Sequence, residues 1–191
     1  MSAMKMFVRI ALVAAVSLAR ANEPSAPPSD AVARGKYLVS TSACNDCHTP
    51  WHLTDHGPEP DMTRMLSGHP ESLEMPAAPA VPGPWQMVAG ATNTAWAGPW
   101  GVSFTANLTP DRETGLGKWT ERNFIETIRT GRHLGRGRPV LPPMPIPVYN
   151  NFTDTDLAAI YAYLRTIPAV KNRVPEPRLA TPPQALAKSG S

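Results

Sequence analysis

The sequence has only two cysteines in 191 residues, and it has no long apolar run. Cys44 and Cys47 stand without a second cysteine pair, and closed zinc sites usually combine one such pair with a second cluster of Cys or His residues. A membrane-spanning helix needs ~20 consecutive apolar residues, and no segment of the chain is apolar for that long. These absences argue against a structural zinc site and against a transmembrane span.

The first 21 residues are typical of a secretory signal peptide. Lys5 and Arg9 precede a short apolar region, residues 10–18, and residues 19–21 form a small-x-small cleavage sequence. A retained membrane anchor is the alternative. Three of the 18 lysines and arginines lie in this leader, which leaves 15 basic against 15 acidic side chains. We therefore expect an exported, periplasmic protein, and the balanced charge gives no reason to expect a nucleic-acid partner.

The most informative stretch is Cys44-Asn45-Asp46-Cys47-His48. A Cys-x-x-Cys-His sequence is the attachment site of a c-type haem. Two cysteines on one helical turn can each form a thioether with a haem vinyl group, and the next residue then carries an imidazole beneath the iron. We predict that Cys44 and Cys47 hold haem c covalently and that His48 is the proximal ligand. A chain with two cysteines carries one such haem at most.

Two other chemistries also use a Cys-x-x-Cys sequence. A thioredoxin-like dithiol follows a strand in a βαβ unit, and no such pattern precedes Cys44. A zinc half-site could recruit His52, His56 or His69, but these residues are irregularly spaced. A thiol redox protein and a zinc site remain as alternatives to haem.

A haem with one histidine ligand needs a sixth ligand, a water molecule or a vacancy. Methionine raises the reduction potential and suits electron transfer. The candidates are Met62, Met65, Met75, Met87 and Met144. Met144 lies between prolines that restrict the backbone, immediately before the last predicted helix, so we predict that it is the second ligand. The alternatives are an ordinary packing role for Met144 and ligation by His133 from a mobile loop rich in glycine and arginine.

Capping residues and apolar spacing predict three helices. The first begins near residue 29 and runs towards the cysteines. The second begins after Thr120 and stops at Gly131. The last begins after Thr153, has apolar residues at helical spacing, and ends by Pro168.

The remaining segments lack this periodicity. Residues 22–29 are expected to be a flexible linker, and residues 175–191 a mobile tail rich in proline, alanine and serine. Between them, a domain of residues 30–174 contains a proline-rich stretch, residues 49–100, that resembles a long loop insertion. Four tryptophans in this insertion would be costly to leave in water, so we expect the insertion to be ordered against the domain.

Two features together resemble a known family. The order of helix, Cys-x-x-Cys-His, loops, helix, Pro-x-Met loop and terminal helix resembles a class I cytochrome c domain. Residues 107–111, Asn-Leu-Thr-Pro-Asp, and residues 114–119, Thr-Gly-Leu-Gly-Lys-Trp, resemble a signature of the cytochrome c subunits of periplasmic alcohol and gluconate dehydrogenases. The resemblance covers residues 30–170. Subunits of that family usually carry three haem domains, whereas this chain has one.

The resemblance implies an all-α fold, a cytochrome c-like helical domain around one covalent haem. In such a domain the first and last helices cross. By this resemblance, Gly35 and Val39 should pack against Tyr161 and Leu164.

The resemblance also implies that Asn107 and Trp119 lie near the haem propionates as hydrogen-bond donors. The alternative is that Asn107 shapes a turn and that Trp119 belongs to the core. One of the arginines that follow could neutralise a propionate, and the others could face an acidic partner or only solvent. These are Arg129, Arg132, Arg136 and Arg138.

Together, these features predict a periplasmic monohaem cytochrome that carries single electrons between redox partner proteins and is not an enzyme. No nucleophile–base pair or pair of carboxylates suggests a second chemistry. One alternative is a haem enzyme with an open distal site. Another is a cytochrome subunit docked to a membrane-associated dehydrogenase or oxidase complex, with the tryptophan-rich insertion as its docking face.

Overall fold

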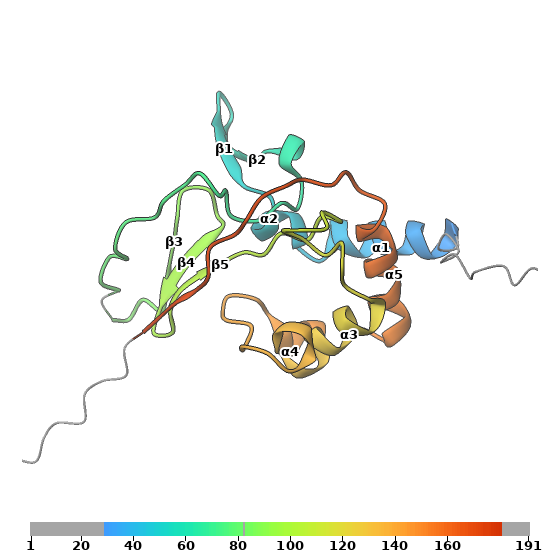
Figure 1. The fold of residues 1–191 in the computed structure, drawn as a ribbon. Coiled ribbons are helices and arrows are strands. Elements are labelled where there is room, and N and C mark those ends of the chain that lie inside the picture. Colours follow the sequence, from blue (N-terminus) through green and yellow to red (C-terminus); the bar gives the residue numbers. More distant parts are fainter. Residues whose placement is uncertain (1–28, 82, 181–191) are drawn as a thin grey trace, which may run out of the picture.

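The computed structural model describes residues 29–81 and 83–180 (Figure 1). The predicted signal peptide and the end of the predicted tail lie outside the described residues. None of the helices in the described part of the chain has the length and apolar character needed to cross a lipid bilayer.

The helical part of the molecule consists of α1 (Ser29–Thr41), α2 (Cys44–His48), α3 (Glu121–Thr130), α4 (Ile146–Tyr149) and α5 (Asp154–Leu164). Short 3-10 helices, η1 (Met62–Arg64) and η2 (His133–Gly135), lie in the connections. In Figure 1, α1 and α5 lie side by side, and α3 and α4 form a second group next to α5.

The predicted helix ends are confirmed for α3 and α5. The Thr120 hydroxyl accepts a hydrogen bond from the amide of Asn123, and the Asn123 side chain accepts one from the amide of Thr120. Gly131 ends α3 in the left-handed conformation, at φ 63°. At the start of α5, the Thr153 hydroxyl accepts from the amide of Asp156. Caps of this kind satisfy backbone groups that a helix leaves without partners at its ends.

The contact between α1 and α5 is made close by Gly35. A Cβ atom at this position would lie 1.9 Å from the carbonyl oxygen of Ala159 and 2.8 Å from the Cβ of Tyr163. The first and last helices therefore pack as predicted, but Gly35 meets a different face of α5 from the one expected. Gly35 contacts Ala159 and Tyr163, and Tyr161 lies two positions from each of them in α5. The Tyr161 ring therefore turns towards α3, where it packs on Phe124 with ring centroids 5.8 Å apart.

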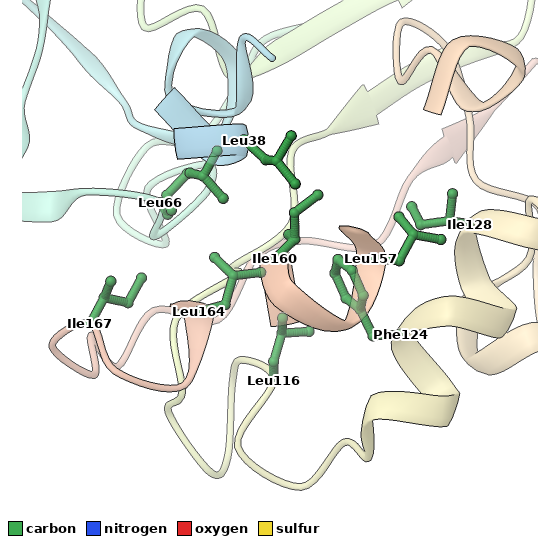
Figure 2. Close-up of a cluster of buried hydrophobic side chains, with 10 residues drawn as sticks. Leu38, Leu66, Leu116, Phe124, Ile128, Leu157, Ile160, Leu164 and Ile167 are labelled. Carbon is green, nitrogen blue, oxygen red and sulfur yellow. The ribbon is translucent and has the colours of Figure 1, made fainter. Parts of the chain in front are cut away.

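The main core lies between α1, α3 and α5. Leu157, Ile160 and Leu164 of α5 are buried at helical spacing, and Figure 2 shows them surrounded by side chains from α1 and α3 and by Leu66 from a loop. Burying a side chain of this size stabilises a fold by roughly 1.5–3 kcal/mol. Because α2 follows α1 directly, this core also fixes the cysteine-bearing helix.

The predicted all-α class is wrong. The described residues contain two antiparallel sheets in addition to the helices. The first is a hairpin of β1 (Trp51–Thr54) and β2 (Gly57–Pro60), which projects at the top of Figure 1. Two of the four residues of β2 are prolines. These are tolerated because each strand of a two-stranded sheet leaves half of its backbone groups unpaired.

The second sheet has the strand order β3 (Val88–Ala89), β4 (Ala95–Gly98), β5 (Gly101–Phe104) and β6 (Arg178–Leu179). The C-terminal segment leaves α5, passes α2 and joins this sheet at the left of Figure 1. Gly101 allows this approach, because its φ is +104° and a Cβ atom there would lie 2.1 Å from the carbonyl oxygen of Arg178. The segment after α5 thus connects the helical core to the sheet.

Candidate haem site

A cavity of about 600 Å³ lies between α2, the loop after β5, α3 and the segment that leads into α4. Its walls are mostly apolar, and its volume is within the range of about 300–1,000 Å³ that is usual for cofactor pockets. All six residues predicted to bind the cofactor line it. They are Cys44, Cys47, His48, Asn107, Trp119 and Met144.

The two cysteines lie one helical turn apart on α2 and are not bridged to each other. Burial raises the pKa of the Cys44 thiol to about 11, and burial, with a smaller effect of Asp46, also raises the pKa of Cys47. Both groups are therefore protonated thiols at neutral pH. A redox dithiol instead needs a thiol whose pKa is lowered by its surroundings, so this environment disfavours the dithiol alternative.

His48 is 8% exposed and is held from two sides. Its Nδ1 lies 2.8 Å from the carbonyl oxygen of Ala106. Because a carbonyl oxygen can only accept, Nδ1 carries the hydrogen and Nε2 keeps a free lone pair. On the other side, the backbone carbonyl oxygen of His48 accepts a hydrogen bond of 2.7 Å from the amide of Gly68. Burial lowers the pKa of His48, which favours the neutral ring that can bind a metal.

Gly68 is a positioning residue that the sequence did not reveal. Its φ is +78°, and a Cβ atom there would lie 2.5 Å from the carbonyl oxygen of Thr105. The residue therefore allows the loop below His48 to lie directly on the segment that follows β5. Glycine is the residue best suited to this conformation and to this close approach.

Met144 lines the cavity and packs against the main core. The preceding loop is anchored to β5, because the Ser103 hydroxyl donates a 2.6 Å hydrogen bond to the carbonyl oxygen of Pro142. By contrast, Met62 is 56% exposed and Met87 is 39% exposed. Of the five candidate methionines, Met144 alone lines this cavity.

His133 also lines the cavity. Its ring meets the ring of Trp119 edge-on, with centroids 5.1 Å apart. It lies in η2, where its amide donates to the carbonyl oxygen of Arg138 and its carbonyl oxygen accepts from the amide of Gly137. The segment is thus internally hydrogen-bonded, unlike the mobile loop expected from the sequence. The structure brings both candidate sixth ligands to the same cavity.

The Asn107 side chain is 4% exposed, and its hydrogen bonds go to the protein. The amide nitrogen donates to the carbonyl oxygens of Val170 and Asn172, and the amide oxygen accepts from the amide and hydroxyl of Thr109. Asn107 therefore ties the loop after β5 to the segment after α5. This arrangement matches the turn-shaping alternative to propionate binding.

Asn172 is the buried partner in this network, and no sequence motif pointed to it. It is 2% exposed. Its amide nitrogen donates to the carbonyl oxygens of Ser67 and His69, and its amide oxygen accepts from the amide of Glu71. One side chain thus joins the loop next to His48 to the C-terminal segment.

The predicted arginines are used in different ways. Arg129 forms hydrogen bonds with the Asp154 carboxylate and with the carbonyl oxygens of Asn150 and Phe152, so it braces α3 against the start of α5. Arg138 lines the cavity and pairs with Glu176 at 3.1 Å. Arg132 and Arg136 are not among the cavity-lining residues.

The donor set fits a c-type haem. Two thiols, one imidazole with an available Nε2, and a thioether are the groups that hold haem c and its iron, and here they line one apolar cavity. Among the described residues, no group of three or more His, Cys, Asp or Glu side chains is arranged to hold a metal ion directly.

Comparison with known proteins gives three informative relatives, although no family model matches the chain. The chain is 26% identical over 160 residues to the fructose dehydrogenase cytochrome subunit of Gluconobacter japonicus, and the aligned stretch covers 81% of this chain and 26% of that protein. It is 28% identical over 158 residues to the alcohol dehydrogenase (quinone) cytochrome c subunit of Gluconobacter oxydans, and the aligned stretch covers 80% of this chain and 25% of that protein. The predicted resemblance to dehydrogenase cytochrome c subunits is confirmed.

A third relative is the gluconate 2-dehydrogenase cytochrome c subunit of Pantoea cypripedii. It is 27% identical over 132 residues, or 69% of this chain and 22% of that protein. The chain thus spans about a quarter of the length of these three relatives. What aligns with them is a stretch of 132–160 residues, about the size of one ordinary domain.

Proposed function

We propose that this chain carries single electrons through one haem c, held by Cys44 and Cys47 and ligated by His48 and Met144. The single observation that supports this most strongly is that the two thiols and the histidine of α2 line one apolar cavity together with a methionine from a distant segment. The bound group supplies an iron centre that cycles between Fe(III) and Fe(II).

The protein's own residues have separate roles in this proposal. His48 offers Nε2 to the iron, while its Nδ1–H bond to Ala106 holds the ring in place. Met144 offers its sulfur from a loop that Ser103 anchors. Apolar side chains such as Leu157 and Ile160 keep water away. Because both residues are held in place by the protein, they would move little between the two oxidation states, and electron transfer would need little rearrangement.

We also propose that the chain works as a docked cytochrome subunit or domain that receives electrons from a dehydrogenase in the periplasm. The names of the relatives support this better than they support a freely diffusing carrier, because each is a cytochrome subunit of a dehydrogenase. The predicted secretion signal supports the location, since c-type haems are attached outside the bacterial cytoplasm.

Mass spectrometry of the protein purified from a periplasm competent for haem attachment tests the first part. We expect one haem adduct per chain in the wild type and none in a variant that combines Cys44→Ser with Cys47→Ser. Two free thiols and no adduct in the wild type would overturn the haem proposal.

Purification at native expression level tests the second part. We expect a dehydrogenase to co-purify with the tagged chain and to reduce its haem when that enzyme's own substrate is added. A haem-loaded monomer that no co-purified enzyme reduces would contradict docking and leave the free carrier.

A further inference from the structure

The segment that follows α5 lines one side of the cavity with charged residues. Residues 173–177 belong to the cavity wall, together with Glu113 and Arg138. Their position is fixed at both ends. Asn172 is buried in the network described above, and Arg178 belongs to β6, which pairs with β5.

The charges at this wall are paired, with one exception. Glu176 forms an ion pair with Arg138 at 3.1 Å, and Glu113 forms one with Lys171 at 3.3 Å. Arg173 also lines the cavity, yet among the described residues no carboxylate lies within ion-pair distance of its guanidinium. The nearby Glu71 carboxylate instead accepts a 2.9 Å hydrogen bond from the backbone amide of Arg173.

An unpaired guanidinium at the wall of a cofactor cavity is suited to a carboxylate, because its planar donors can make two parallel hydrogen bonds. A c-type haem brings two carboxylates, its propionates. The arginines predicted from the sequence are less available for this role, since Arg129 is bonded to Asp154 and Arg138 to Glu176.

We propose that Arg173, on the segment between α5 and β6, binds a haem propionate and raises the reduction potential of the iron. This inference rests on the proposed haem function. A guanidinium that neutralises a propionate leaves less negative charge beside the iron, and less negative charge favours Fe(II) over Fe(III). Arg173 is thus a positioning and tuning residue and does not itself bind the iron.

The test measures the reduction potential of the haem-loaded wild type, Arg173→Gln, Arg173→Lys and the matched control Arg136→Gln. Arg136 is an exposed arginine that forms no ion pair with the described residues and does not line the cavity. We expect Arg173→Gln to shift the redox equilibrium about threefold towards Fe(III), as for an exposed ion pair. At about 59 mV for each tenfold change in this equilibrium, the reduction potential should fall by ~28 mV. Arg136→Gln should change the equilibrium much less.

Resonance Raman spectroscopy of the propionate bending band gives a second readout that does not depend on activity. Arg173→Lys keeps the charge but loses the paired donors, so it should restore most of the potential while still shifting the band. If Arg173→Gln and Arg136→Gln give the same potential, or if Arg173→Lys leaves the band unchanged, the inference is wrong. A wild-type protein without haem would instead refute the proposed function itself.

Discussion

Replacing Gly35 by alanine tests the close approach of α1 and α5 on which the haem cavity depends. The added Cβ would lie 1.9 Å from the carbonyl oxygen of Ala159, far inside normal contact. The obstacle is backbone, so it cannot rotate away, and the helices would have to separate to make room. That separation would loosen the packing of Val39 and Leu38 against α5.

The cost can be estimated from two opposing effects. Overpacking of a well-filled core destabilises a protein by about 1–3 kcal/mol. Alanine in place of glycine inside a helix recovers about 0.5–1 kcal/mol. We therefore expect Gly35→Ala to lower the free energy of unfolding by about 1–2 kcal/mol. At about 2–4 °C for each kcal/mol in a chain of this size, Tm should fall by about 2–8 °C.

Urea unfolding of the haem-loaded protein, followed by circular dichroism, measures this effect. Ser40→Ala is a suitable control, because Ser40 lies on the exposed face of the same helix, and its replacement should change stability by less than about 0.5 kcal/mol. If Gly35→Ala is as stable as the wild type or more stable, the reasoning about the helix contact is refuted.

Three further predictions follow from the loops around the cavity and from the contact between α1 and α5. Asn172→Ala should lower the free energy of unfolding in urea by about 2–4 kcal/mol, because it leaves buried backbone groups unpaired. Replacing an exposed amide, in Gln86→Ala, should change it by less than about 0.5 kcal/mol, and equal effects would contradict the network. Gly68→Ala should lower the free energy of unfolding by about 1–3 kcal/mol and reduce the haem-to-chain ratio measured by absorbance, because the positive φ of Gly68 and its contact with the next loop both oppose a side chain. An unchanged ratio and an unchanged stability would count against this role of Gly68. Arg34 lowers the pKa of the Asp156 carboxyl, so this ion pair stabilises the fold above the unfolded pKa of ~3.9, and the stabilisation is lost as the pH falls below that value. Asp156→Asn should therefore show a smaller loss of urea midpoint than the wild type between about pH 5 and pH 2. An identical pH profile in the two proteins would argue against the pair.

The three longest helices, α1, α3 and α5, could be predicted because their signals are local. Thr120 and Thr153 cap helices through bonds three residues away, and Gly131 ends α3 through its own backbone angle. Each signal needs only the neighbouring residues. Cys44 and His48 likewise belong to one short motif, so their joint presence in the cavity followed from spacing alone.

The strands were not predicted because they are short and because several of them contain residues with weak strand preference. β4 contains alanine and glycine, and β2 contains two prolines, so neither shows the alternation of apolar and polar residues that marks a half-buried strand. β1 and β5 do alternate, but over only four residues each, next to or within a proline-rich stretch. β6 forms only because the chain after α5 returns to β5. Such pairing depends on the path of the chain in space, which the sequence does not display.

The roles of polar residues were equally hidden. Asn107 was recognised from its motif, but its partners Val170 and Asn172 lie 63 and 65 positions away. Nothing near Asn172 in the sequence marks it as a buried residue. Its hydrogen bonds can be found only once the loops are placed together.

The near-infrared absorption of the oxidised protein tests the proposed iron coordination most directly. A weak sulfur-to-iron band should appear in the wild type and in Met62→Ala, whose side chain is exposed and outside the cavity. The band should be lost in Met144→Ala. Its absence from the haem-loaded wild type, or its persistence in Met144→Ala, would contradict ligation by Met144, and the second outcome would point to another sulfur ligand.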